Sequence, residues 1–166
     1  MEKVYGTSER HDQLIVFKDS NKATLIYGYG EDDGQGYDLR HTFDHIPTRE
    51  EVRNVIYAYI NQQTDLAILS GYTFEGHMVW LNTENQFNYK AAYDLALQTG
   101  GATLPITAKL GNDDAPYYRD FNDIETFAGF YIGAVQHIQQ TLGQGWILKS
   151  EAAIWVESLP DTIFSA

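Results

Sequence analysis

The segment from Gly71 to Gly101, GYTFEGHMVWLNTENQFNYKAAYDLALQTGG, contains the pattern that decides the fold class. Side chains alternate on either side of Glu75-Gly76, which predicts a β-hairpin over residues 72–81. A capping-box spacing at 83–86 predicts that a helix begins there, and its expected buried face comprises Phe87, Ala91 and Leu95, with Ala92 and Ala96 beside them. Gly100 and Gly101 are typical of a left-handed helix end. The segment therefore predicts a hairpin followed by one helix.

The same order recurs on both sides of this segment. Upstream, apolar runs at 13–18 and 23–29 predict a hairpin and 37–43 a third strand. A capping box from Thr48 to Glu51 predicts a helix over 48–62, with a short turn or helix over 64–70. Downstream, we expect paired strands at 102–110 and 117–121, then a helix from Asn122 to Gly143. Antiparallel hairpins alternating with three helices, in the order ββ(β)αββαββα, predict an α+β fold.

Chain length and a weak pattern near the end set the predicted domain organisation. A chain of 166 residues is the size of one ordinary domain. After Gly145 the apolar residues keep no clear period, and Pro160 interrupts them. We therefore expect a single α+β domain at 1–146 and an irregular C-terminal arm at 147–166.

The acidic composition excludes several classes of function. The net charge is −12 and the 11 Lys and Arg residues are scattered, whereas nucleic-acid and anionic-membrane binding draw on clustered basic residues.

No cysteine is present, which removes a disulfide framework and a thiolate metal site. No signal-peptide pattern is visible, and the longest nearly apolar run, 127–135, is shorter than the roughly 20 residues of a membrane span. We expect a soluble protein made in a cytoplasm that contacts neither nucleic acid nor membrane directly.

Two groups of residues resemble ion or nucleotide sites without matching them. The loop at 28–34 has the spacing GxGxxxG and carries acids where a phosphate would need positive charge. Its acids could ligate Ca²⁺, but the EF-hand spacing is absent among Glu31, Asp32, Asp33 and Asp38. His41 and His45 stand four residues apart, yet Pro47 argues against the helix that would let them share a metal. We predict a solvated loop, surface histidines, and neither a metal nor a cofactor.

No catalytic constellation stands out in the sequence. A nucleophile elbow of the form GxSxG is absent. The carboxylates best placed for glycoside cleavage are Glu75, Glu84 and Asp94, and Glu84 is better explained as an acid near the positive end of a helix dipole. The expectation is a non-enzymatic protein with no catalytic residues.

Aromatic and amide side chains form the remaining candidate site. The chain has 12 Tyr, 8 Phe and 3 Trp residues, and most of these rings are expected to fill the core. Rings mixed with Asn and Gln are also typical of sugar-binding and protein-binding surfaces, where amides orient the ligand and rings stack on it. The candidate binding residues are Trp80, Glu84, Asn85, Gln86, Asn88, Tyr89, Trp146 and Trp155.

The stretch from Thr64 to Ile106 resembles an uncharacterised domain family of phage and prophage proteins, often encoded near or within tail-associated genes. The shared features are an aspartate-containing turn, an aliphatic pair, a Gly-aromatic hairpin with glycine at its tip, a Trp-Leu step and an ENQ-aromatic-N-aromatic helix start. In this chain they are Asp65, Ile68 with Leu69, Gly71-Tyr72, Gly76, Trp80-Leu81 and Glu84-Asn85-Gln86-Phe87-Asn88-Tyr89. The likeness extends more loosely over 48–146, and the family carries no established catalytic residues to transfer.

This resemblance implies a phage-encoded structural or accessory protein, tail-associated in the virion and synthesised in the host bacterial cytoplasm. Its expected partners are other virion proteins and further copies of itself. One alternative is a carbohydrate-binding module that uses aromatic and Asn side chains. A second is an acidic anti-defence protein that mimics nucleic-acid charge.

Overall fold

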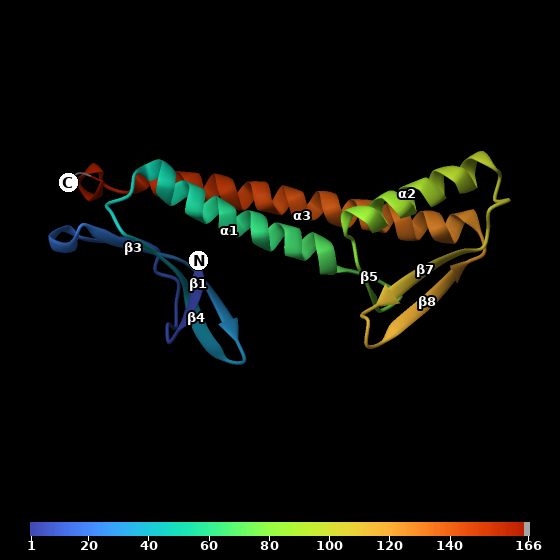
Figure 1. Ribbon diagram of the computed structural model, residues 1–166, viewed down its shortest axis with the longest axis horizontal. Helices are drawn as coiled ribbons and strands as arrows, with labels where there is room; N and C mark the ends of the chain where they lie inside the picture. Colours follow the sequence, from blue (N-terminus) through green and yellow to red (C-terminus); the bar gives the residue numbers. More distant parts are fainter. Residues whose placement is uncertain (165–166) are drawn as a thin grey trace. The chain divides into compact units, whose positions relative to one another are not determined.

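The computed structural model describes residues 1–164 and has the predicted α+β class (Figure 1). Residue contacts divide the chain into two compact units. The first comprises Met1–Asn61 and the chain from Trp146 onward, and the second comprises Gln62–Gly145. This grouping differs from the predicted division into a domain at 1–146 and an arm at 147–166.

The first unit contains a four-stranded antiparallel sheet. Its strands are β1 (Glu2–Tyr5), β2 (Gln13–Phe17), β3 (Lys22–Asp32) and β4 (Gln35–Phe43), in the order β1-β4-β3-β2. The last three confirm the predicted strands, but β3 continues through Asp32 into the stretch at 28–34 that was expected to be a loop, and the turn is limited to Asp33 and Gly34. β1 was not predicted, because the short sequence EKVY has no apolar alternation to distinguish it from a loop.

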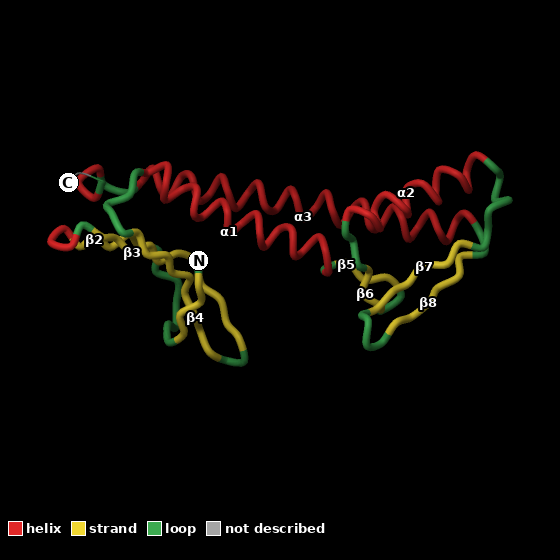
Figure 2. Tube along the Cα trace, in the orientation of Figure 1, coloured by secondary structure: helices red, strands yellow, loops and turns green. Residues whose placement is uncertain are grey.

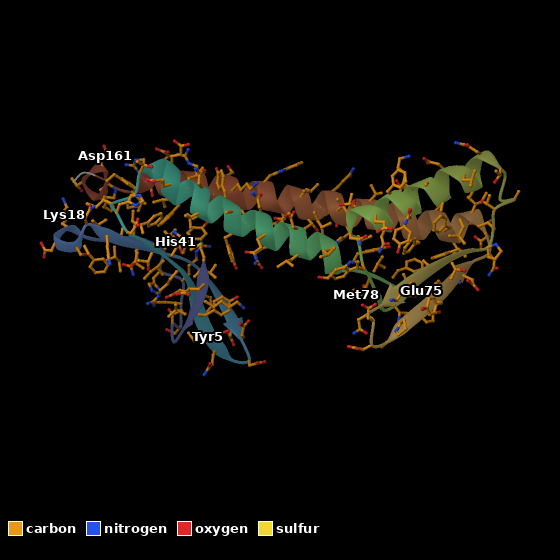
Figure 3. All side chains as sticks on the ribbon, viewed as in Figure 1. Tyr5, Lys18, His41, Glu75, Met78 and Asp161 are labelled. Atoms are coloured by element: carbon orange, nitrogen blue, oxygen red, sulfur yellow. The ribbon has the colours of Figure 1, made fainter. Side chains whose placement is uncertain are left out.

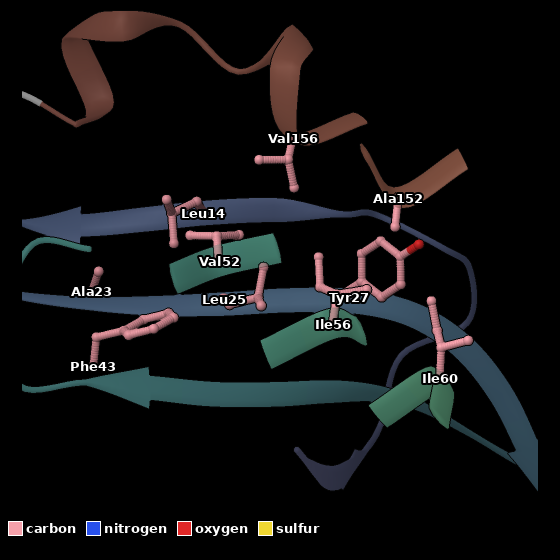
Figure 4. Close-up of a cluster of buried hydrophobic side chains, with 10 residues drawn as sticks. All are labelled: Leu14, Ala23, Leu25, Tyr27, Phe43, Val52, Ile56, Ile60, Ala152 and Val156. Atoms are coloured by element: carbon pink, nitrogen blue, oxygen red, sulfur yellow. The ribbon is translucent and has the colours of Figure 1, made fainter. Parts of the chain in front are cut away.

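One face of this sheet packs against α1 (Arg49–Ser70) and the last part of α3 (Ile124–Ser158). Figure 4 shows the resulting core of Leu14, Ala23, Leu25, Tyr27, Phe43, Val52, Ile56, Ile60, Ala152 and Val156. The predicted capping box starts α1: the Thr48 amide donates to Glu51 Oε2 at 2.7 Å, and the Glu51 amide donates to Thr48 Oγ1 at 3.2 Å.

Both long helices extend beyond their predicted ends. α1 runs without a break to Ser70, so the separate element expected at 64–70 is its last turns. The prediction of an irregular arm is wrong, because α3 continues through Ser158 and buries Ala152 and Val156. These positions, four residues apart, lie on one helical face. Arg49 binds the carbonyls of Val156 and Leu159, each at 2.6 Å, which satisfies acceptors at the helix end.

The second unit contains two hairpins and one complete helix (Figure 2). The hairpins are β5 (Tyr72–Phe74) with β6 (His77–Val79) and β7 (Ile106–Gly111) with β8 (Pro116–Phe121), and the helix is α2 (Thr83–Gln98). A short 3-10 helix, Asp161–Ile163, ends the described part of the first unit. The core of the second unit is built around Phe121, Phe127 and Phe130.

The buried face of α2 differs from the prediction. Phe87 and Leu95 are 68% and 48% exposed, whereas Ala96 is buried and Tyr89, Ala92 and Tyr93 pack on the phenylalanine core. The Thr83–Gln86 capping box is also shifted, because Asn82 is the N-cap and its Oδ1 accepts from the Asn85 amide at 2.8 Å. The inward face therefore carries Tyr89, Ala92, Tyr93 and Ala96 in place of Phe87 and Leu95.

The start of α3 is also displaced by one residue, but towards the C-terminus. Asp123, not Asn122, caps this helix, since its Oδ1 accepts from the Thr126 amide at 2.7 Å. The strand expected from 102 begins only at Ile106, after the glycine-ended α2 and Pro105.

Candidate functional site

A pocket of about 510 Å³ lies in the second unit, where α2 faces β6 and β7. Its lining is Met78, Trp80, Asn85, Asn88, Tyr89, Ala92, Ile106, Thr107, Ala108, Lys109, Gly111, Asn112 and Asp113. Figure 3 labels Met78 on the β5–β6 hairpin, which forms one wall. The volume falls within the roughly 300–1,000 Å³ typical of ligand pockets.

The first turn of α2 fixes the backbone that carries Trp80. Asn85 Nδ2 donates to the Trp80 carbonyl at 2.8 Å, and Gln86 Nε2 donates to the Leu81 carbonyl at 2.6 Å. Leu81 is buried, and its amide donates to the Leu69 carbonyl at 2.9 Å. Trp80 remains 41% exposed, so an anchored backbone carries a partly exposed indole.

Tyr89 lines the pocket from the α2 side. Its ring meets Phe130 edge-on, with centroids 4.9 Å apart and planes at 83°. Burial raises the pKa of Tyr89 above its ordinary value, because the phenolate would lose hydration there. The residue therefore presents a neutral hydroxyl on a ring that the core holds in place.

The β7–β8 side contributes polar groups that are already partly engaged. Lys109 Nζ binds Asp113 Oδ1 at 2.6 Å, and Asn112 Oδ1 accepts from the Ala115 amide at 2.7 Å. Thr107 Oγ1 donates to Asp120 Oδ1 at 2.5 Å. Lys109 and Asp113 are the only charged residues in the lining, and they neutralise each other.

The structure brings four of the eight candidate binding residues together in this pocket. They are Trp80, Asn85, Asn88 and Tyr89. Gln86 instead lines an adjoining groove of about 320 Å³ between α2 and α3, which shares Tyr89 as a wall. Glu84 is exposed and lines neither space.

The two candidate tryptophans near the end of the chain belong to the first unit. Trp146 is 66% exposed on α3. Trp155 is half-buried and packs on Tyr27, with centroids 5.4 Å apart, so it supports the core instead of a binding surface. Neither lines the pocket of the second unit.

Sequence reasoning missed the walls that β6 and β7 contribute. Met78, Ile106, Lys109 and Asn112 carry no short-range signal, because they meet α2 only through the pairing of distant segments. The strand alternation at 72–81 identifies the hairpin but does not identify which strand it adjoins.

The carboxylates considered for catalysis are largely engaged elsewhere. Arg119 holds Glu75 through Nε at 2.9 Å and through Nη2 at 3.1 Å, and this pairing lowers the pKa of Glu75. Asp94 forms an i,i+4 ion pair with Lys90. None of the three candidates, Glu84 included, lines the pocket.

The acids and histidines of the first unit also have local partners. Asp32 binds Lys3 at 2.7 Å and Tyr5 at 2.8 Å, while the buried Asp38 takes two hydrogen bonds from Arg40. His41 packs edge-on against Phe43, with centroids 4.7 Å apart. Over residues 1–164, His, Asp and Glu side chains form no group of three or more that could hold a metal ion.

Comparison with known proteins adds no relative. No family model, no curated protein and no solved structure matches this chain. Among the helices described, none combines the length and apolar character that crossing a membrane requires.

Proposed function

We propose that this chain is a non-enzymatic binding protein whose pocket between β6, α2 and β7 takes a saccharide. The observation that carries the proposal is the union in one pocket of an exposed indole, a tyrosine and three asparagines. Asn85, Asn88 and Tyr89 come from α2, whereas Trp80 directly follows β6 and Asn112 directly follows β7.

The chemistry of the lining suits a sugar. A pyranose ring has an apolar face that stacks on an aromatic ring, and it has hydroxyl groups that pair with amides. Trp80 supplies the ring, with its backbone fixed by Asn85. Because the Trp80 backbone is fixed before binding, less conformational entropy is lost when the ligand binds. This loss otherwise offsets weak polar contacts.

A binding role is favoured over hydrolysis by the state of the carboxylates. Glycoside hydrolysis needs two carboxyl groups flanking the scissile bond. The pocket contains a single carboxylate, Asp113, and Lys109 is bound to it. This arrangement supports retention of a ligand without its cleavage.

The biological setting is proposed from the family resemblance alone. A tail-associated virion protein present in several copies could use such a pocket to hold a cell-surface glycan while it contacts other virion proteins. Mass spectrometry of purified particles tests this setting. Absence of the chain from the particle excludes the virion setting but leaves the saccharide-binding proposal standing. The acidic anti-defence role stays a prediction.

The saccharide proposal is tested on a glycan array with two matched tryptophan variants. Trp80→Ala removes the platform and is expected to weaken binding by about tenfold or more, since ring stacking and its buried area contribute about 1–3 kcal/mol. Trp146→Ala removes an exposed indole from the first unit and leaves binding unchanged. Thermal melts by circular dichroism verify that both variants fold.

Two outcomes contradict the proposal. A wild-type chain that binds no glycan on a broad array removes saccharide binding altogether. If Trp80→Ala and Trp146→Ala change glycan binding equally, the pocket has no role in the binding observed.

A further inference from the structure

We infer that the saccharide held in this pocket is uncharged and carries an N-acetyl group. This inference rests on the saccharide-binding function proposed above and names its ligand class. Three features of the pocket support it: the charge balance, the apolar lining, and the amide atoms of two asparagines that can still bind a ligand.

The charge balance favours a neutral ligand. Lys109 and Asp113, the only charged lining residues, are bound to each other at 2.6 Å. An acidic sugar would have to compete with Asp113 for Lys109, on a chain whose net charge is −12. An amino sugar would have to compete with Lys109 for Asp113. A neutral ligand leaves this pair in place.

The lining contains further apolar side chains besides the two aromatic rings. Beside Trp80 and Tyr89, the pocket is lined by Met78, Ala92, Ile106 and Ala108. A sugar hydroxyl placed against these side chains would lose hydrogen bonds to water without replacement. A methyl group in the same place gains free energy by leaving water.

Hydrogen bonds to the backbone fix the amide orientation of two lining asparagines, and each of them keeps a further polar atom for a ligand. Asn85 uses Nδ2 to bind the Trp80 carbonyl, which leaves Oδ1 as the atom that can accept from a ligand. Asn112 uses Oδ1 to accept from the Ala115 amide, which leaves Nδ2 as the atom that can donate. An acetamido group has one N–H donor, one carbonyl acceptor and one methyl group. It therefore matches one acceptor, one donor and an apolar wall.

The test compares sugars that differ only in the acetamido group. An array carries glucose, galactose and mannose oligosaccharides, each as the 2-hydroxy, 2-acetamido and 2-amino form, together with uronate and sialyl glycans. The best-bound pair is then measured by titration calorimetry. We expect the acetamido form to bind about tenfold tighter than its hydroxyl counterpart, from one buried methyl and one further hydrogen bond.

A conservative variant tests the role given to Asn112. Asn112→Asp keeps the oxygen that accepts from Ala115 but replaces the donor with a second acceptor. It is expected to abolish most of the tenfold preference for the acetamido sugar. Asn122→Asp adds the same charge at an exposed residue of the same unit that does not line the pocket, and should leave the preference intact.

The outcomes separate the inference from the function on which it rests. Equal binding of hydroxyl and acetamido forms, or tightest binding of an amino or acidic sugar, overturns the inference while saccharide binding stands. Full preference in Asn112→Asp also overturns it as stated. An array on which the wild type binds nothing removes the proposed function itself.

Discussion

His45 lies between two carboxylates just before α1. Its Nδ1 is 2.8 Å from Asp44 Oδ1, and its Nε2 is 3.0 Å from Glu51 Oε1. Hydrogen bonds to Asp44 and then Glu51 raise the pKa of His45 above its ordinary 6.5. Because both ring nitrogens face acceptors, the doubly protonated ring is the form that satisfies both. The same Glu51 also completes the capping box with Thr48.

This arrangement predicts a pH-dependent contribution to stability. A pKa raised by folding stabilises the folded chain fully below the unfolded value of about 6.5, and the contribution is lost as pH rises through the folded pKa. The lowered pKa values of Asp44 and Glu51 act in the opposite direction, and their contribution is lost only in acid. Wild type should therefore melt at a higher temperature than His45→Gln below about pH 6.5, and the difference should close as pH rises through the folded pKa of His45. A gap independent of pH contradicts this.

Individual residues also explain which local predictions succeed. The Thr48–Glu51 capping box is correct because both of its reciprocal bonds form. The start of α2 offers two competing caps, and Asn82 forms the bond that the pattern assigns to Thr83. Which of two neighbouring residues caps the helix depends on how the preceding hairpin positions the backbone. The local sequence pattern does not contain that information.

At the scale of elements, α1 and α3 meet closely at Gly145. A Cβ built on Gly145 would lie 2.6 Å from Thr64 Oγ1 and 3.3 Å from Thr64 Cγ2, whereas one on Gly143 would meet nothing within 4 Å. Glycine is therefore required where the helices approach, and α3 passes through both positions without ending. Treating these glycines as a helix end is the error behind the predicted arm.

This contrast predicts opposite effects for two neighbouring substitutions. Gly145→Ala should destabilise the chain by about 1–3 kcal/mol, because the added methyl crowds the β-branched Thr64. Gly143→Ala should stabilise it by about 0.5–1 kcal/mol through helix propensity alone. Urea denaturation of both variants measures the difference. Equal effects would show that the helices can separate at no cost.

The α2 helix shows why its buried face was not predicted. Phe87, Ala91 and Leu95 share one face in the sequence pattern, and Tyr89, Ala92, Tyr93 and Ala96 share another. Both faces carry apolar atoms, so periodicity alone does not decide between them. Tyrosines on the second face match the ring-rich core, where Tyr93 stacks on Tyr131 and Tyr89 meets Phe130.

At the scale of the whole molecule, distant parts of the sequence complete one unit. Residues 146–164 join residues 1–61, and Arg49 ties the end of α3 through Val156, Leu159 and Asp161. The α+β class follows from local patterns, and these identify every described strand except β1 and place the starts of α1, α2 and α3 to within one residue. The grouping of residues 146–164 with residues 1–61 cannot be predicted from local patterns, because it depends on contacts between residues about 100 positions apart.

Removing residues 150–166 should therefore destabilise the first unit. The deletion exposes the surface that Ala152 and Val156 cover and frees Arg49. We expect the melting temperature to fall by about 10 °C or more. Hydrogen exchange should show lost protection in β2–β4 and retained protection in β7–β8. A truncated chain that melts with the wild type would make this segment dispensable.

The pocket of the second unit has a further consequence at the level of the gene. All of its lining residues fall between Met78 and Asp113, an uninterrupted stretch of sequence. The phenylalanines that support it, Phe121, Phe127 and Phe130, lie just outside. A single recombination event across that stretch would replace every wall of the pocket at once, together with the core residues Val79, Leu81, Ala108 and Leu110, and would keep the three phenylalanines. All walls of the pocket are thus encoded by one contiguous stretch of the gene.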